Sequence, residues 1–211
     1  MRVSCSTPFH IARRAQTLWR QRRLARLALI FAGCAARCAG FASPAMAQQP
    51  KPEEYQVKAV YLYNFGRFVE WPASAKTGNS FAICVLGRDP FGAALDTTVA
   101  GAIIDNQKLV ARRVSSAREA TNCRILFISS SESNHGKDIL AELEKGPVLT
   151  VSDMPGFAGN GGMIQFVLRE NKVRFEVNLA AAEKAGLTLS SQLLKVATEI
   201  KKEPGGADVK K

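Results

Sequence analysis

Catalytic and metal-binding sites are usually built around histidine or cysteine, and this sequence places few of them together. After residue 47 its one histidine is His135, which lies beside Ser133 and Asn134 in a polar stretch. A Ser-His-Asp triad needs a positioned nucleophile and an orienting carboxylate as well as the base. No Gly-x-Ser-x-Gly, Walker or His-Glu-x-x-His motif occurs in the sequence. We therefore expect His135 to be a solvated loop residue and the protein not to be an enzyme.

Two cysteines, Cys84 and Cys123, remain after residue 47. They are not arranged as Cys-x-x-Cys, which argues against a redox enzyme, and in an oxidising compartment they can form a structural disulfide. Buried free thiols are the less favoured alternative. With one histidine, a zinc site would need an unusual set of carboxylate ligands, so we predict no metal and no cofactor.

The glycine-rich segment GFAGNGG, residues 156–162, invites comparison with phosphate-binding loops. Such loops need the start of a helix behind them, whereas this segment connects two predicted strands. We expect a flexible loop with Phe157 packed against the core.

Polar residues follow three predicted strands, where the loops after parallel strands can form a ligand crevice at the carboxyl edge of a sheet. The candidate crevice residues are Arg88, Asp89, Ser129, Ser130, Ser131 and Asp153. Helix caps and turns are the favoured alternative for these positions, because short polar side chains readily accept hydrogen bonds from nearby backbone N–H groups.

Apolar runs predict the strands that precede these loops. The runs are residues 81–86, 125–128 and 148–151. Runs without alternation are typical of central strands that helices cover on both faces. Residues 137–145 carry Ile139, Leu140 and Leu143 at helical spacing, which predicts a strand-helix-strand unit with parallel strands. Residues 107–114 predict a further strand.

Residues 163–168 and 172–177 flank Glu170-Asn171, a turn signal, and the second segment alternates between apolar and charged residues, which predicts an antiparallel hairpin with one wet face. Strands at a sheet edge can pair with another chain, including a second copy. The candidate partner surface is therefore Arg169, Lys172 and Arg174.

Residues 55–72 predict a long helix that is mostly buried. Its apolar arc is formed by Tyr55, Val57, Tyr61, Leu62, Phe65, Phe68 and Val69. Lys58 interrupts this arc, and we expect its stem to lie on apolar surface while its ammonium reaches water. Pro72 ends the helix and leaves Trp71 packed at its end.

Two short helices are predicted near the C-terminus. Asn178 caps the first, over residues 179–185, and Ser190 or Ser191 caps the last, which turns Leu193, Leu194, Ala197 and Ile200 toward the core. Together the elements predict a single α/β domain, residues 48–202, whose mixed sheet has a largely parallel centre, an antiparallel hairpin and helices on both faces.

The N-terminal segment, residues 1–47, holds eight arginines and no acidic residue, followed by an apolar run and an Ala-Met-Ala ending. This layout predicts a secretory signal peptide cleaved after Ala47, with lipoprotein processing at Cys34 as the less favoured alternative. The remaining chain holds 21 Lys+Arg and 18 Asp+Glu, a net charge of +3, so its basicity does not indicate nucleic acid binding. Residues 203–211 predict a disordered tail.

The chain resembles the YfiR family of periplasmic regulators in five blocks that occur in order. They are YQVKAVYLYNFGRFVEWP, FAICVLGRDPFG, CRILFISSSE, VLTVSDMPGFAGNGGMIQF and KVRFEVNLAAAEKAGLTLSSQLLKVA. The spacing of Cys84 and Cys123 matches a cysteine pair of that family. A second pair that better-known members carry is replaced here by Ala158 and Gln165, which puts redox sensing through two bridges in doubt.

The resemblance implies a repressor that binds the periplasmic sensor region of an inner-membrane diguanylate cyclase and keeps cyclic di-GMP low. It also implies an outer-membrane lipoprotein that could sequester the repressor, and a homodimer is a further expected partner state. The alternative is a periplasmic small-solute receptor that uses the loop edge of the sheet. A hydrolase or redox enzyme has the least support.

Overall fold

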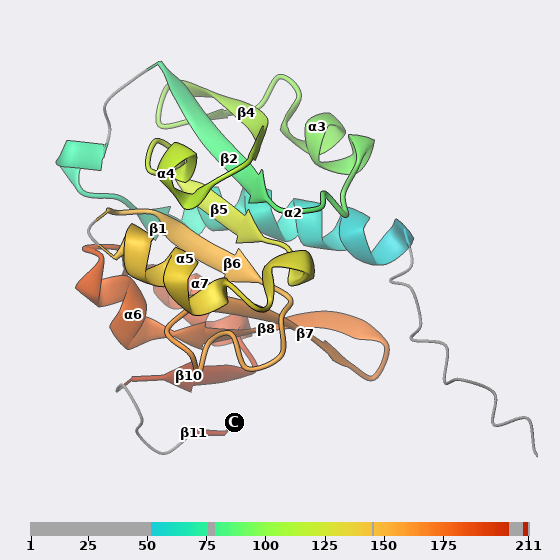
Figure 1. Cartoon of the computed structure of the whole chain (residues 1–211), viewed down its shortest axis with the longest axis vertical. Coiled ribbons are helices and arrows are strands. Elements are labelled where there is room, and N and C mark those ends of the chain that lie inside the picture. The colour runs from blue at the N-terminus through green and yellow to red at the C-terminus, as the bar shows by residue number, and fades with distance from the viewer. Residues whose placement is uncertain (1–51, 76–78, 145, 203–208, 211) are drawn as a thin grey trace, which may run out of the picture. The chain divides into compact units, whose positions relative to one another are not determined.

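The computed structural model describes residues 52–75, 79–144, 146–202 and 209–210. The predicted signal peptide and most of the predicted tail lie outside these residues. The described residues belong to one compact unit. Within the described residues one sheet has nine strands in the order β11-β10-β8-β7-β6-β5-β2-β4-β3 (Figure 1).

The centre of the sheet is parallel, and an antiparallel pair flanks it on each side. Neighbouring strands from β4 through β2, β5 and β6 to β7 are parallel, whereas β3 with β4 and β7 with β8 are antiparallel. The strands are β2 (Ser80–Leu86), β3 (Ile103–Ile104), β4 (Gln107–Val114), β5 (Ile125–Ile128), β6 (Leu149–Ser152), β7 (Ile164–Arg169), β8 (Lys172–Asn178), β10 (Glu199–Lys201) and β11 (Val209–Lys210). The predicted mixed α/β sheet is therefore confirmed.

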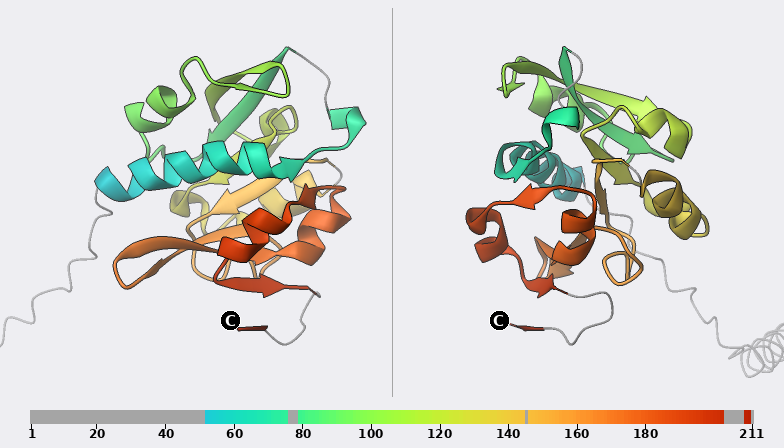
Figure 2. Two further views of the ribbon diagram at one scale, coloured as in Figure 1. Left: turned by 180° about the vertical axis from the view of Figure 1, so that it is seen from behind. Right: turned by 90° about the vertical axis from the view of Figure 1, so that its left-hand side faces the viewer.

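Helices cover both faces of the sheet because its central strands are apolar on both sides. One face packs against α2 (Pro52–Phe68), α3 (Ala93–Val99), α6 (Leu179–Lys184) and α7 (Ser191–Val196). The other packs against α4 (Ala117–Ala120) and α5 (Gly136–Leu143). Figure 1 shows α4 and α5 in front of the sheet, and the reversed view in Figure 2 shows α2 lying across its opposite face.

The helix predicted over residues 55–72 ends earlier than expected, at Phe68. The next two residues form the short strand β1 (Val69–Glu70), which pairs antiparallel with β9 (Thr188–Leu189). This pairing gives the backbone after Phe68 new hydrogen-bond partners, while Pro72 prevents a return to helix. Trp71 is buried against Phe81, with ring centroids 5.2 Å apart, as predicted.

Two side-chain predictions for this helix are wrong. Val57 was placed on the buried arc but is 45% exposed. Lys58 was expected to reach water but is only 3% exposed, because two carboxylates meet its ammonium inside the protein.

The C-terminal elements start as predicted and end differently. The side chains of Asn178 and Ser190 cap α6 and α7 by accepting from the backbone N–H groups of Ala181 and Leu193. However, α7 ends at Val196, and Ile200 lies in strand β10 instead of a helix. Strand β8 still has hydrogen-bonding groups to satisfy at this edge, and β10 pairs parallel with it.

Candidate interaction surface

The β7–β8 hairpin places the three predicted basic residues on one side. Glu170 and Asn171 form its turn with φ of 50° and 59°, the left-handed conformation of a two-residue type I′ hairpin. In the register, Arg169 lies opposite Lys172 and Val167 lies opposite Arg174. Directly opposed residues share a face, as do alternate residues of one strand. The three basic side chains therefore share the face turned away from the aromatic core.

These basic side chains differ in whether they already have a hydrogen-bond or ion-pair partner. The Arg169 guanidinium lies 3.3 Å from the Glu176 carboxylate, and Arg174 donates a weak hydrogen bond, 3.4 Å long, to the Val173 carbonyl. Lys172 is exposed and forms no ion pair with any residue that the structure describes. Lys172 and Arg174 can thus meet a partner without breaking a buried contact.

The hairpin also forms a groove with the first half of α2, and residues from both of its faces line that groove. The groove has a volume of about 380 Å³, with Val57, Tyr61, Leu168 and Val173 among its apolar lining. Its charged lining is Glu53, Glu54, Lys172 and Arg174. We call this hollow, together with the basic hairpin face beside it, the hairpin groove.

Exposed apolar side chains gather at this groove. Val57 and Leu168 line the groove and are 45% and 55% exposed, and Val60, which is 49% exposed, lies outside the groove lining, one helical turn from Val57. Single exposed apolar residues are ordinary, whereas several close together with a polar rim are typical of interaction sites. The alternating pattern of the hairpin could be recognised in the sequence, but its approach to α2 could not.

The free edge of β8 adds unpaired backbone to the same region. Strand β10 pairs with β8 only at residues 176–178. On that side, residues 172–174 have no strand neighbour within the described chain. A partner segment could therefore contact backbone groups as well as the apolar groove.

Hydrogen bonds within and between the loops hold the predicted loop edge of the sheet together. The Arg88 N–H donates to Ser131 Oγ across 2.9 Å, which joins the loops after β2 and β5. Ser129 Oγ accepts from the Ser131 N–H at the start of the short helix η2 (Ser130–Glu132). Asp89 accepts from the Phe91 N–H and from Arg113. These contacts are caps, turns and ion pairs, and Ser130 is exposed beside them. A ligand crevice at these residues stays a prediction.

Asp153, the last of the predicted crevice residues, belongs to a buried cluster. Its Oδ2 accepts from Lys58 Nζ at 2.7 Å and from the Tyr55 hydroxyl at 2.8 Å, while Lys58 also pairs with Glu54 at 2.6 Å. Burial, followed by the Asp153 charge, raises the pKa of the Tyr55 phenol. Asp153 Oδ1 is buried without a hydrogen-bond partner among the described residues. In the sequence, the sign of this cluster was Lys58, which interrupts the apolar arc of the predicted helix.

The cysteines that the sequence singled out are bonded. Cys84 in β2 and Cys123, just before β5, form a disulfide with Cα atoms 6.0 Å apart. At the two positions where the resemblance implies a second bridge, the Ala158 N–H donates to Gln165 Oε1 at 3.0 Å. Asn178 Nδ2 also donates to the Ala158 carbonyl, so side-chain amides hold the glycine-rich loop. Phe157 of this loop is buried, as predicted.

His135 is exposed, with a side-chain exposure of 70%, and begins α5. Within the described part of the chain no group of three or more His, Cys, Asp or Glu residues is placed to hold a metal ion. No helix among those residues is long and apolar enough to span a membrane.

Comparison with known proteins identifies a family. The sequence profile of the YfiR/HmsC-like family matches residues 55–198. No curated protein matches the chain in sequence. Among solved structures, a conserved domain protein from Vibrio cholerae is similar with a TM-score of 0.48 and 12% identity. The ABC domain from Streptococcus pneumoniae in complex with L-Trp is similar with a TM-score of 0.46 and 13% identity. Each similarity covers 70% of this chain and 60% of the other.

Proposed function

This chain belongs to the YfiR/HmsC-like family of periplasmic regulators, and we propose that it represses an inner-membrane diguanylate cyclase by binding the periplasmic sensor region of that enzyme. The proposal places the effect on cyclic di-GMP outside this protein, because the binding partner carries out the synthesis. A regulator of this kind must bind the inactive state of its target more tightly than the active state. The difference between those two affinities sets how far synthesis can be lowered.

The observation that carries the proposal is the hairpin groove. Interfaces combine an apolar centre with a polar rim, and here Val57 and Leu168 are exposed beside Lys172 and Arg174. We expect the partner to insert apolar side chains into the groove and to place acidic side chains against the basic hairpin face. Opposite charges at the rim would steer the encounter and select the partner.

The test reverses the charge of Lys172 and Arg174. Arg169 is kept, because its guanidinium pairs with the nearly buried carboxylate of Glu176. We expect Lys172→Glu/Arg174→Glu to weaken repression without unfolding the protein. The control is Lys108→Glu/Lys195→Glu, which reverses two exposed lysines in β4 and α7. Each version is expressed in a strain that lacks the gene, and cyclic di-GMP is measured together with the thermal unfolding of the purified protein.

Deletion of the gene is expected to raise cyclic di-GMP and biofilm formation, and the control variant should restore the low level while the hairpin variant should not. An unchanged cyclic di-GMP level after deletion would count against the repressor function itself. Full repression by the folded hairpin variant would instead rule out this surface. Affinity purification of the tagged protein from solubilised membranes should recover a membrane cyclase, and the hairpin variant should lose it.

A further inference from the structure

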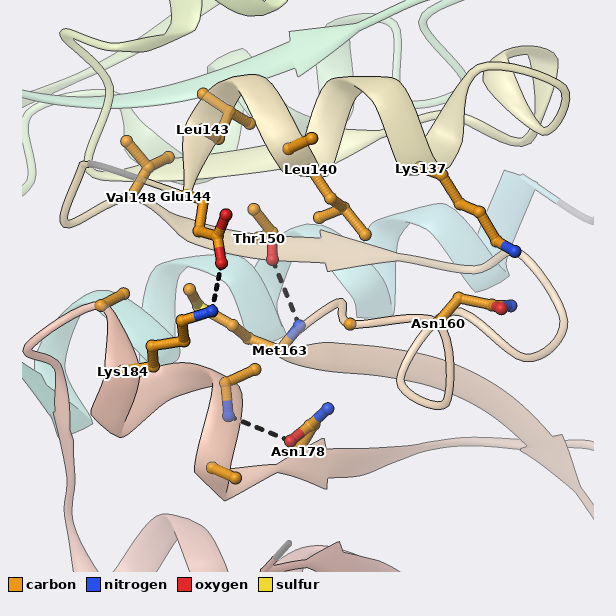
Figure 3. A pocket seen from close by; sticks show the side chains of 15 residues that line it. Lys137, Leu140, Leu143, Glu144, Val148, Thr150, Asn160, Met163, Asn178 and Lys184 are labelled. Carbon is orange, nitrogen blue, oxygen red and sulfur yellow. Dashed lines mark hydrogen bonds and ion pairs between the residues drawn. The ribbon is translucent and has the colours of Figure 1, made fainter. Parts of the chain in front are cut away.

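A second hollow lies away from the hairpin groove, between α5 and α6 (Figure 3). Its volume is about 330 Å³, near the lower limit of pockets that bind small molecules. Strand β6 and the segment that leads into β7 form its floor. None of the six residues predicted for the loop-edge crevice lines it.

The floor and walls of this α5–α6 pocket are aliphatic. Leu140, Leu143, Val148 and Met163 line it together with alanines of α6, and none of its lining residues is aromatic. Such a lining suits a flexible hydrocarbon chain, which gains by burial but finds no ring to stack on.

Most polar groups of the pocket already form hydrogen bonds or ion pairs within the protein. Thr150 Oγ1 accepts from the Met163 N–H at 3.2 Å, and Asn178 Oδ1 accepts from the Ala181 N–H at 3.0 Å. Glu144, directly after α5, and Lys184 of α6 form an ion pair that closes one end, as Figure 3 shows. These groups hold the walls together and leave little capacity to orient a ligand.

Lys137 is the exception. It starts the same helix that carries Leu140, and Figure 3 shows its ammonium at the end of the pocket opposite the Glu144–Lys184 pair, near Asn160. Lys137 has no ion pair with any residue in the described part of the chain. An unpaired cation at one end of an aliphatic hollow matches a molecule with an anionic head and a short hydrocarbon tail.

We propose that the α5–α6 pocket binds a small aliphatic carboxylate, with its tail on Leu140, Val148 and Met163 and its carboxylate at Lys137. The proposal goes beyond the repressor function and does not depend on it. It also places a solute site where β6 and β7 begin, away from the carboxyl edge at which the sequence predicted one.

Three probes distinguish the contribution of the ligand's hydrocarbon tail to affinity from that of its carboxylate charge. Hexanoate carries both, hexanamide carries the tail without the charge, and acetate carries the charge with almost no tail. Each is titrated into the ¹⁵N-labelled protein recovered from the periplasm, and amide signals are followed by NMR. We expect hexanoate to shift the signals of Ala141, Gly161 and Ala181 in a saturable way. Acetate should bind more than about tenfold more weakly, because each buried CH₂ contributes to affinity.

The charge is tested with Lys137→Gln. The ion pair between the Lys137 ammonium and the hexanoate carboxylate would be exposed to solvent. We therefore expect hexanoate affinity to fall about two- to fivefold, toward that of hexanamide. Lys195→Gln removes an exposed lysine on α7 and should change nothing. Absence of saturable shifts at the pocket would overturn the site. Equal affinity for hexanoate and hexanamide, or an unchanged affinity in Lys137→Gln, would overturn the carboxylate assignment.

Discussion

Lys58 is the residue whose environment departs most from what its type suggests. Its ammonium lies between the carboxylates of Glu54 and Asp153 and 4.3 Å from the centre of the Tyr55 ring. A buried ion pair can cost as much in desolvation as it returns in attraction, but a buried charge that loses its partner is always costly. The cluster therefore fixes where the start of α2 meets the loop after β6.

We expect Lys58→Met to lower the free energy of unfolding by about 3–5 kcal/mol, because it leaves the Asp153 carboxylate buried without its cation. Urea unfolding measures the change, with Lys195→Met as a control on an exposed lysine. Adding Asp153→Asn to Lys58→Met should recover part of the loss, since the two residues are directly coupled. A loss no larger than that of an exposed ion pair, about 1 kcal/mol or less, would contradict this view of the cluster.

The elements that the sequence could predict are those whose patterns are local. Strands β4 and β5 have the predicted bounds, and the apolar runs, the Glu170-Asn171 turn and the Asn178 cap are all properties of neighbouring residues. The short strands β1, β9 and β10 were missed because two or three residues carry no periodicity. They are strands only because another segment lies beside them.

The same limit applies to the candidate surface. Charge and alternation marked the hairpin, while the groove depends on how α2 crosses the sheet. Lys58 and Asp153 are 95 residues apart in the chain, so their contact is set by tertiary packing alone.

The hairpin turn allows a prediction at the scale of an element. Glu170 holds a positive φ of 50°, which is unfavourable for most residues and tolerated by asparagine. We expect Glu170→Asn to raise the free energy of unfolding by up to about 1 kcal/mol, measured by urea unfolding. Glu183→Asn is the control, because that residue lies in α6 and asparagine is a poorer helix former. An unchanged or lower stability of Glu170→Asn would show that the turn is not strained at this position.

At the scale of the whole molecule, the sheet separates two cores of unequal size. The larger one holds α2 and most of the aromatic side chains, and the smaller one lies under α4 and α5 and contains Cys84 and Cys123. The disulfide connects β2, in the parallel part of the sheet, to the segment that enters β5. Its closed loop contains α3, β3, β4 and α4. One covalent bond therefore restricts a large part of the unfolded chain.

Reduction of this bond should lower the free energy of unfolding by about 3–4 kcal/mol, because it closes a loop with a sequence separation of 39 residues, between the 15- and 100-residue cases of about 3 and 4.7 kcal/mol. Urea unfolding with and without dithiothreitol measures the difference, and mass spectrometry verifies the state of both thiols. Cys84→Ala/Cys123→Ala should unfold at the same urea concentration in either condition. If the wild-type midpoint did not move although both thiols were free, the bond would add no stability. The fold would then rest on its two cores alone, and export to an oxidising compartment would not be needed for its stability.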